Sequence, residues 1–185
     1  MKLVAAACFA AASVPFAQAS TANLRVSRDS TVSFNGIMCN NNTVPCSSIP
    51  LGLQTKLTTF KGNRDYERVL LGFDLPTNHP SRCILRIPRP IDAASTEYAL
   101  TATITDNIWD EATVSGYNKQ NAGKQIASLN VTAAKPLPGA LDITAACLAA
   151  QNGKLSLFVD TSFPLVSFNS IQSGSPDIFY LDYSF

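Results

Sequence analysis

The stretch of sequence that decides the fold reads Asp65-Tyr66-Glu67-Arg68-Val69-Leu70-Leu71-Gly72-Phe73-Asp74-Leu75-Pro76. A polar lead-in is followed by the most densely apolar strand candidate of the chain. Val69, Leu71 and Phe73 fall on one face at the strand period of two, while Leu70 and Gly72 leave the opposite face without polar groups. We therefore predict a central strand that is covered on both faces. Pro76 ends it, because proline has no N–H to donate to a sheet.

Short strand candidates, separated by turns, lie on both sides of this stretch. They cover residues 24–28, 31–34, 53–60, 82–88, 98–105, 154–161 and 177–185. One alanine-rich segment, 144–152, favours a short helix with Asp142 and Thr144 as cap candidates. The last segment is too hydrophobic to lie free in water, so we expect an interior strand near the opening strand. With no βαβ alternation, the predicted fold is all-β, an antiparallel jelly-roll β-sandwich with one short helix.

The first 19 residues have the features of a secretory signal peptide. Lys2 supplies the positive end, a mostly apolar run follows, and Ala17-Gln18-Ala19 fits the small-x-small cleavage pattern. The apolar run is too short to span a membrane. We therefore expect residues 1–19 to be removed and residues 20–185 to form a single exported domain without a membrane span.

The charge of the chain is close to balanced. There are 14 basic and 13 acidic residues, and one of the basic residues is Lys2 in the leader. Nucleic-acid binders concentrate positive charge, so this balance argues against a nucleic-acid partner. The many Thr, Ser, Asn and Pro residues are typical of an extracellular all-β protein.

Four cysteines remain once Cys8 leaves with the leader. In an exported protein they are expected to form two disulfides, for which three pairings exist. We favour Cys39 with Cys46, which closes a short polar loop, and Cys83 with Cys147, which joins a strand to a distant segment. A zinc site is disfavoured, because the Cys-x6-Cys spacing is not that of a zinc knuckle and the chain has one histidine.

Two Asn-x-Thr triplets are candidate N-glycosylation sites. One begins at Asn41, inside the first cysteine loop, and the other at Asn130. In a eukaryotic cell both would have to lie on the surface to carry glycans.

Three motifs in order resemble a known family. Arg68 precedes Phe73-Asp74-Leu75-Pro76, a Cys83-x-Leu85-x-Ile87 strand follows, and Trp109-Asp110-Glu111-Ala112-Thr113-Val114 comes before Tyr117-Asn118. The chain from Val26 to Phe185 thereby resembles the DNRLRE-type domain, also classed as carbohydrate-binding module family 96. Tyr117 stands where the family commonly has tryptophan, and Gln120 stands at its proline position. The extra cysteines look like those of a secreted eukaryotic variant, such as a fungal one. The resemblance implies a jelly-roll sandwich that binds polysaccharide, with acidic polymers such as alginate among the family's ligands.

Ligand candidates come from the concentration of basic residues between the second strand and the proline corner. Half of the chain's 14 basic residues lie there. Uronates require Arg or Lys, and the apolar faces of sugars require aromatic rings. The candidate ligand-binding residues are Lys56, Arg64, Tyr66, Arg68, Arg82, Arg86 and Tyr117. Four of the basic residues, Lys56, Arg68, Arg82 and Arg86, fall on predicted strands. Their side chains could line one groove, or they could be solvated and paired locally with Asp65, Glu67 and Asp74.

No catalytic constellation is evident. Asp110 and Glu111 are neighbours and would point to opposite faces of a strand, and His79 lies in a turn. We expect no cofactor, with a structural calcium as an alternative for which Asp29, Asp106 and Asp110 are candidate ligands.

The sequence therefore predicts a secreted, non-catalytic polysaccharide-binding protein for acidic or cell-wall glycans. The alternatives are a structural wall or matrix protein, a secreted interaction protein, and a small polysaccharide lyase or hydrolase. The oligomeric state is left open.

Overall fold

The computed structural model describes residues 20–34, 38–39, 44–63, 65–118, 120–162 and 165–185. The predicted signal peptide, Arg64 and Asn41 lie outside these ranges. The longer strands are β1 (Thr21–Arg25), β2 (Arg28–Ser33), β5 (Lys56–Lys61), β6 (Tyr66–Asp74), β7 (Arg82–Ile87), β9 (Tyr98–Thr105), β10 (Ala122–Val131), β11 (Gly139–Asp142), β12 (Lys154–Thr161), β13 (Val166–Asn169) and β14 (Tyr180–Ser184). The short elements are β3 (Met38–Cys39), β4 (Val44–Pro45), β8 (Asp92–Ala93), the helix α1 (Thr144–Ala149) and the 3-10 helices η1 (Cys46–Ser48) and η2 (Ile171–Ser173).

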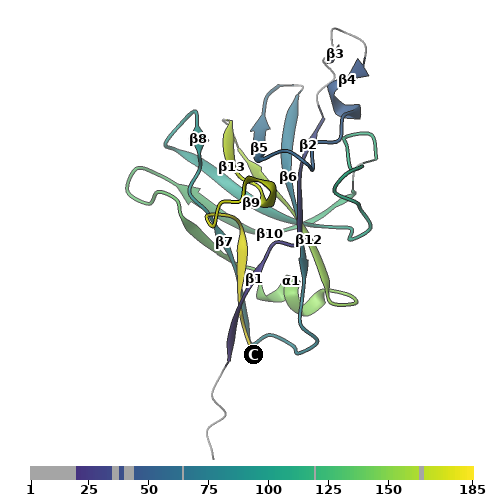
Figure 1. Cartoon of the computed structure of the whole chain (residues 1–185). Helices are drawn as coiled ribbons and strands as arrows, with labels where there is room; N and C mark the ends of the chain where they lie inside the picture. The colour runs from purple at the N-terminus through teal and green to yellow at the C-terminus, as the bar shows by residue number, and fades with distance from the viewer. Residues whose placement is uncertain (1–19, 35–37, 40–43, 64, 119, 163–164) are drawn as a thin grey trace, which may run out of the picture.

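Two antiparallel sheets form the layers of a sandwich (Figure 1). Within the described residues, the smaller sheet has the strand order β1-β14-β7-β11. The larger has the order β10-β9-β12-β6-β5-β13-β8, with β2 also paired to β6. The chain passes between the layers repeatedly, from β6 to β7 and back to β9, for example. This arrangement confirms the predicted antiparallel β-sandwich with one short helix.

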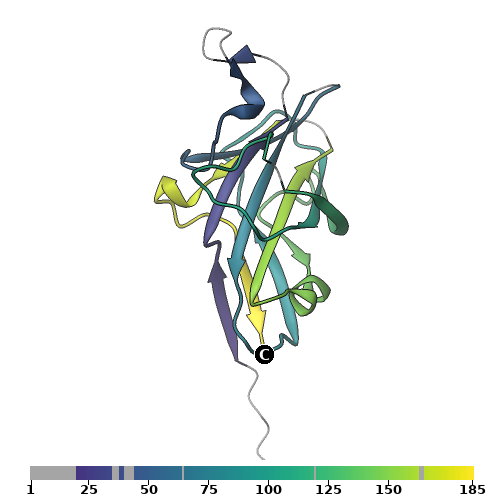
Figure 2. The ribbon, with the colours of Figure 1, turned by 90° about the vertical axis from the view of Figure 1, so that its right-hand side faces the viewer.

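The opening and closing strands lie side by side. Thr21 of β1 pairs with Ser184 of β14, and β14 lies between β1 and β7 as an interior strand. Figure 2 shows the strands running along the long axis of the molecule. The prediction that the hydrophobic end of the chain pairs near its start is therefore confirmed.

Strand β6 is central in the larger sheet, as its sequence predicts. On one edge it pairs with β12, where Val69 lies opposite Val159, and on the other with β2, where Val69 lies opposite Thr31. On the N-terminal side of Val69, β6 pairs with β5 instead of β12, so that Glu67 lies opposite Phe60. The sheet therefore forks at the N-terminal end of β6.

The main core lies between the two sheets. Val69, Leu71 and Phe73 of β6 are buried there against Leu85 of β7 and Leu181 of β14. Burial of apolar side chains from both layers is the main favourable term for this architecture, at roughly 25 cal/mol per Å² removed from water.

A second, smaller core covers the outer face of the larger sheet. Its buried members are Val32, Leu70, Trp109, Val114 and Phe158. The indole N–H of Trp109 donates to Ser156 Oγ at 2.9 Å, so the ring packs without losing its hydrogen bond. Residues 106–118 thus close over the sheet, and both faces of β6 are covered, as predicted.

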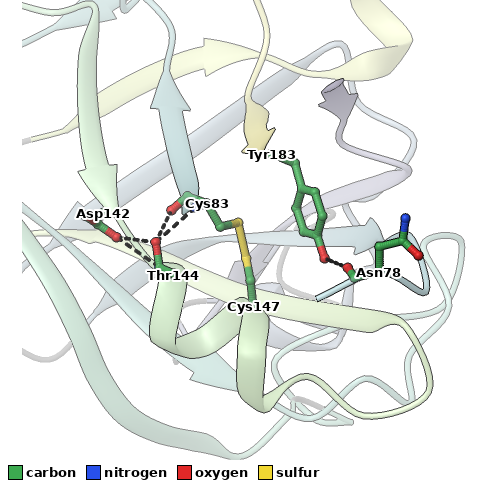
Figure 3. The surroundings of a disulfide bond; sticks show 6 residues. All are labelled: Asn78, Cys83, Asp142, Thr144, Cys147 and Tyr183. Atoms are coloured by element: carbon green, nitrogen blue, oxygen red, sulfur yellow. Dashed lines mark hydrogen bonds between the residues drawn. A yellow bond between two sulfur atoms is a disulfide. The ribbon is translucent and has the colours of Figure 1, made fainter. Parts of the chain in front are cut away.

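The Cys83–Cys147 disulfide is confirmed and joins β7 to α1 (Figure 3). Beside it, Thr144 Oγ1 donates to Asp142 Oδ1 at 2.7 Å and accepts from the N–H of Cys83 at 2.9 Å. The Thr144 hydroxyl, together with the Thr144 backbone N–H that donates to the same Asp142 oxygen at 3.0 Å, lowers the pKa of Asp142 below its usual value. The helix ends at Ala149, three residues earlier than predicted, because Ala150 already has extended backbone.

Cys46 is also disulfide-bonded, as predicted, whereas the side chain of Cys39 lies outside the described part of the structure. None of the helices among the described residues is long and apolar enough to cross a membrane.

Candidate functional site

A cleft of about 450 Å³ opens at the fork of the larger sheet. Its floor comes from alternate residues of β6, β9 and β12 on the outer face of the sheet, and the end of β5 closes one side. The lining residues are Phe60, Lys61, Tyr66, Glu67, Arg68, Thr101, Thr103, Gln125, Asp160, Thr161 and Ser162. The cleft therefore combines one exposed aromatic ring with charged and hydroxyl-bearing side chains.

Arg68 and Asp160 form a bidentate ion pair on the floor of the cleft. Arg68 Nε donates to Asp160 Oδ1 and Nη2 to Oδ2, each at 2.6 Å. Their side chains are 14% and 24% exposed, so both keep some contact with solvent. Two parallel hydrogen bonds fix the guanidinium and the carboxylate in one plane.

The guanidinium of Arg68 also lies over the ring of Phe158, with Cζ 3.9 Å from the ring centroid. Phe158 is fully buried in the second core. A cation held over an aromatic face gains electrostatic stabilisation. Arg68 is consequently held from below by the core and from the side by Asp160, before any ligand binds.

Tyr66 supplies the aromatic surface. Its ring stacks on Phe34 with centroids 4.2 Å apart and an interplanar angle of 11°. The residue is 37% exposed. Stacking on Phe34 restricts the ring, so its free surface has a defined orientation beside Arg68.

Hydroxyl and amide groups complete the polar surface. Thr101 and Thr103 on β9 alternate with Leu100 and Ala102, which face the main core. Gln125 on β10 lies opposite Thr103 in the sheet register. These groups both donate and accept hydrogen bonds.

The described charges of the cleft are balanced. Lys61 and Arg68 are basic, and Glu67 and Asp160 are acidic. Burial raises the pKa of Glu67 above its usual value. The cleft therefore does not present the excess of positive charge expected of a site for a polyanion.

Two larger hollows, of about 540 Å³ each, lie around the end of α1 and carry less binding chemistry. One of them is lined by the 74–80 turn, which includes His79. Tyr183 also lines it and is 1% exposed. The Tyr183 hydroxyl donates to the carbonyl of Asn78 at 2.6 Å (Figure 3). The ring of Tyr183 is therefore not free to pack on a sugar there.

Comparison with known proteins finds a secreted relative. A protein of Arthroderma benhamiae described as an uncharacterized secreted protein is 32% identical over 142 residues, which are 75% of this chain and 72% of the relative. The chain belongs to the same family as this secreted protein. No protein-family model matches the chain. The resemblance to DNRLRE-type domains therefore stays a prediction, whereas secretion of the chain agrees with the family.

Within this family member, the structure separates the predicted ligand residues. Tyr66 and Arg68 line the cleft, but Arg82 and Arg86 lie on β7 in the smaller sheet, the other layer of the sandwich. Arg86 pairs there with Asp182. One groove lined by all the predicted strand cations is thus not formed, because β6 and β7 belong to different sheets.

The other predicted ligand residues lie away from the cleft. Lys56 at the start of β5 is 3.7 Å from Asp92 in an exposed ion pair. Tyr117 is exposed, as predicted, and its backbone N–H donates to the carbonyl of Ser47 at 3.2 Å. Arg64 lies outside the described residues.

The partner of Arg68 also differs from the local ones expected for it. Arg68 pairs with Asp160 rather than with Asp65, Glu67 or Asp74, and Asp74 instead accepts from Lys154 at 2.9 Å. Sequence reasoning missed Asp160, Thr101, Thr103 and Gln125 as cleft residues. The alternation that points Thr101 and Thr103 outward could have identified these two residues. Asp160 could not be identified in this way, because residue spacing does not show that β6 pairs with β12.

Two of the carboxylates considered for catalysis or metal binding, Asp106 and Asp110, have structural partners. Asp110 Oδ1 accepts from the N–H of Ala112 at 3.0 Å and from Thr113 Oγ1 at 3.3 Å. Asp106 accepts from Asn121 at 3.2 Å on the surface. Over the described ranges, no three His, Cys, Asp or Glu side chains gather as a metal cluster. Asn130 is exposed, as a glycan acceptor must be, and its occupancy stays a prediction.

Proposed function

We propose that this chain is a secreted, non-catalytic polysaccharide-binding protein whose binding site is the cleft between β6, β9 and β12. The observation that carries the proposal is the half-exposed ring of Tyr66, stacked on Phe34, beside the fixed Arg68–Asp160 pair. A pyranose has an apolar face that packs on an aromatic ring and equatorial hydroxyls that need planar donors and acceptors. Tyr66 supplies the first requirement, and Arg68 and Asp160 supply the second.

The charge of the cleft favours a neutral wall glycan over an acidic one. Arg68 is already neutralised by Asp160, and Glu67 adds a second acidic group near Lys61. A uronate would have to compete with Asp160 for the guanidinium. A neutral glycan can accept from the outer N–H groups of Arg68 and donate to Asp160 without separating them.

Affinity gel electrophoresis tests the proposal against soluble β-glucan, glycol chitin, pectin and alginate. We expect retardation by a neutral glycan that changes little with salt, because neutral contacts are not screened. Tyr66→Ala should weaken binding about tenfold. Tyr117→Ala is the matched control, since Tyr117 is exposed but lies outside the cleft. Loss of binding in the control with retention in Tyr66→Ala would place the site elsewhere.

The panel also separates the enzymatic alternative. Release of new reducing ends or unsaturated products from any retained glycan would contradict the non-catalytic role. No retardation on any of the four polymers would overturn binding of these glycans.

A secreted interaction protein is the second candidate. It is favoured by three exposed apolar side chains, Leu53, Ile108 and Tyr117, at 66%, 89% and 71% exposure. Their loops are neighbours, because a Cβ on Gly52 would meet the carbonyl oxygen of Glu111 at 1.9 Å. Leu53→Ser with Ile108→Ser should abolish association with wall preparations if this surface is used, and leave glycan retardation unchanged.

A further inference from the structure

Asp29 on β2 is a buried carboxylate that lacks a donor for one oxygen. The residue is 0% exposed. Oδ2 accepts from the backbone N–H of Ile171 at 2.9 Å, whereas Oδ1 is buried with no hydrogen-bond partner among the described residues. Buried polar atoms are nearly always satisfied, so an orphaned carboxylate oxygen requires an explanation.

A second carboxylate lies beside it. Glu111 Oε1 accepts from the backbone N–H of Asp29 at 2.7 Å. Of the Lys and Arg residues that the structure describes, none forms an ion pair with either carboxylate. Burial, opposed in part by the Ile171 hydrogen bond and reinforced by the charge of Glu111, raises the pKa of Asp29 to about 7. Two carboxylates are thus held together, and neither has an ion-pair partner among the described residues.

The adjacent 3-10 helix η2 carries another oxygen atom of the kind that can bind a metal ion. Gln172 directly follows Ile171, and its Oε1 is also buried without a donor. The helix is fixed in place by Ser170, whose hydroxyl donates to the carbonyl of Gln54 at 2.6 Å and whose N–H donates to that of Thr55 at 3.2 Å. Acceptors without donors are expected where a cation takes the place of the donors.

We propose that Asp29 and Glu111 bind a calcium ion, with the side-chain oxygen of Gln172 as a further ligand. Calcium takes six to eight oxygen ligands from carboxylates, amide and backbone carbonyls and water, and it tolerates irregular geometry. It would join β2, the 106–118 segment and η2, which are far apart in sequence. The role is structural: the ion fixes the loop that carries Trp109 over the second core.

Terbium luminescence and thermal unfolding test the site. Trp109 is the chain's single tryptophan and stands two residues from Glu111, so excitation of the indole should sensitise a bound terbium ion. Calcium should quench this emission competitively. Calcium added to chelator-treated protein should raise the unfolding midpoint, by about 5 °C at ~100 times its dissociation constant.

Two variants and one control make the test specific. Asp29→Asn and Glu111→Gln keep the side-chain shape and remove the charge, and each should abolish both responses. Asp29→Asn creates an Asn-x-Thr triplet with Thr31, so the proteins should come from a host that does not N-glycosylate. Asp106→Asn is the control, because Asp106 is an exposed carboxylate outside the site.

The outcomes decide the proposal in either direction. Saturable terbium emission and calcium stabilisation in the wild type and Asp106→Asn, lost in Glu111→Gln, support it even where Asp29→Asn fails to fold. Absence of both responses in the wild type overturns it, and Asp29 is then a buried protonated acid. Equal responses in the wild type, Glu111→Gln and Asp29→Asn also overturn it, because the ion then binds elsewhere.

Discussion

Arg68 and Asp160 lie one residue beyond the Val69–Val159 pair that closes the β6–β12 ladder. Their ion pair therefore marks the point where the two strands separate and the cleft begins. The register of β6 and β12 brings the two side chains together. Phe158 of the second core lies beneath the guanidinium of Arg68.

The Arg68–Asp160 pair should contribute measurably to stability. Both side chains are largely buried, so removing one partner leaves the other charge poorly solvated. We expect Arg68→Ala and Asp160→Ala each to lower the free energy of unfolding by about 1–3 kcal/mol. The double variant should lose less than the sum. Urea unfolding of all four proteins measures the coupling, and strict additivity would show that the pair contributes nothing.

Gly72→Ala should destabilise the second core. A Cβ there would lie 2.6 Å from Cγ and Nε of Arg28 and 3.1 Å from Cζ2 of Trp109. Arg28 cannot move freely, because it donates to the carbonyls of Trp109 and Asn107 and lies over the Trp109 ring. The expected cost is about 1–3 kcal/mol. In an Arg28→Ala background the same substitution should cost less, and an equal cost in both backgrounds would contradict this account.

Loss of the Cys83–Cys147 disulfide should weaken the whole fold. The bond closes a separation of 64 residues and ties α1 to the smaller sheet. Cys83→Ala with Cys147→Ala should lower the free energy of unfolding by about 2–5 kcal/mol. Guanidinium unfolding measures this without a reductant, which would also open the disulfide of Cys46. An unchanged midpoint would contradict the prediction.

Asp29 should make stability depend on pH when divalent ions are removed. Its folded pKa of about 7 lies above the ordinary value of 3.8 for an aspartate. Between these values the folded state binds the extra proton, so the free energy of unfolding falls as pH rises, by up to about 1.4 kcal/mol per pH unit. The free energy of unfolding should be measured for the wild type and for Asp29→Asn in chelator from pH 4 to 8. The difference between the two proteins isolates the contribution of Asp29 from those of Glu67 and Asp142. Parallel curves would show that Asp29 has an ordinary pKa.

Much of the fold could be predicted from strand periodicity. Residues 98–105 and 154–161 match β9 and β12, because alternation of Leu100 and Ala102 with threonines leaves one face to the core. Strand β10 (Ala122–Val131) was missed, since its exposed edge position leaves few buried residues and its register shifts twice. Strands β11 and β13 are short, and partners distant in sequence rather than their own residues define them.

The candidate site was less predictable. Tyr66 and Arg68 were both predicted, and both line the cleft. The basic residues that lie close together in the sequence nevertheless belong to two different layers, because β7 is a strand of the smaller sheet. Local spacing gives the face of a strand and not the sheet to which it belongs. The same reasoning explains Asp160, which is 92 residues from Arg68 in sequence and meets it only through the β6–β12 pairing.

The pairing of β1 with β14 has a consequence for orientation at a surface. Both ends of the described chain leave the sandwich at one end, while the β5–β6 hairpin that borders the cleft lies at the opposite end (Figure 1). A tether attached at either terminus would therefore hold the end of the sandwich that carries the cleft away from the tethering surface. A reporter or immobilising tag can be placed at the start or the end of the domain with the same presentation of the cleft.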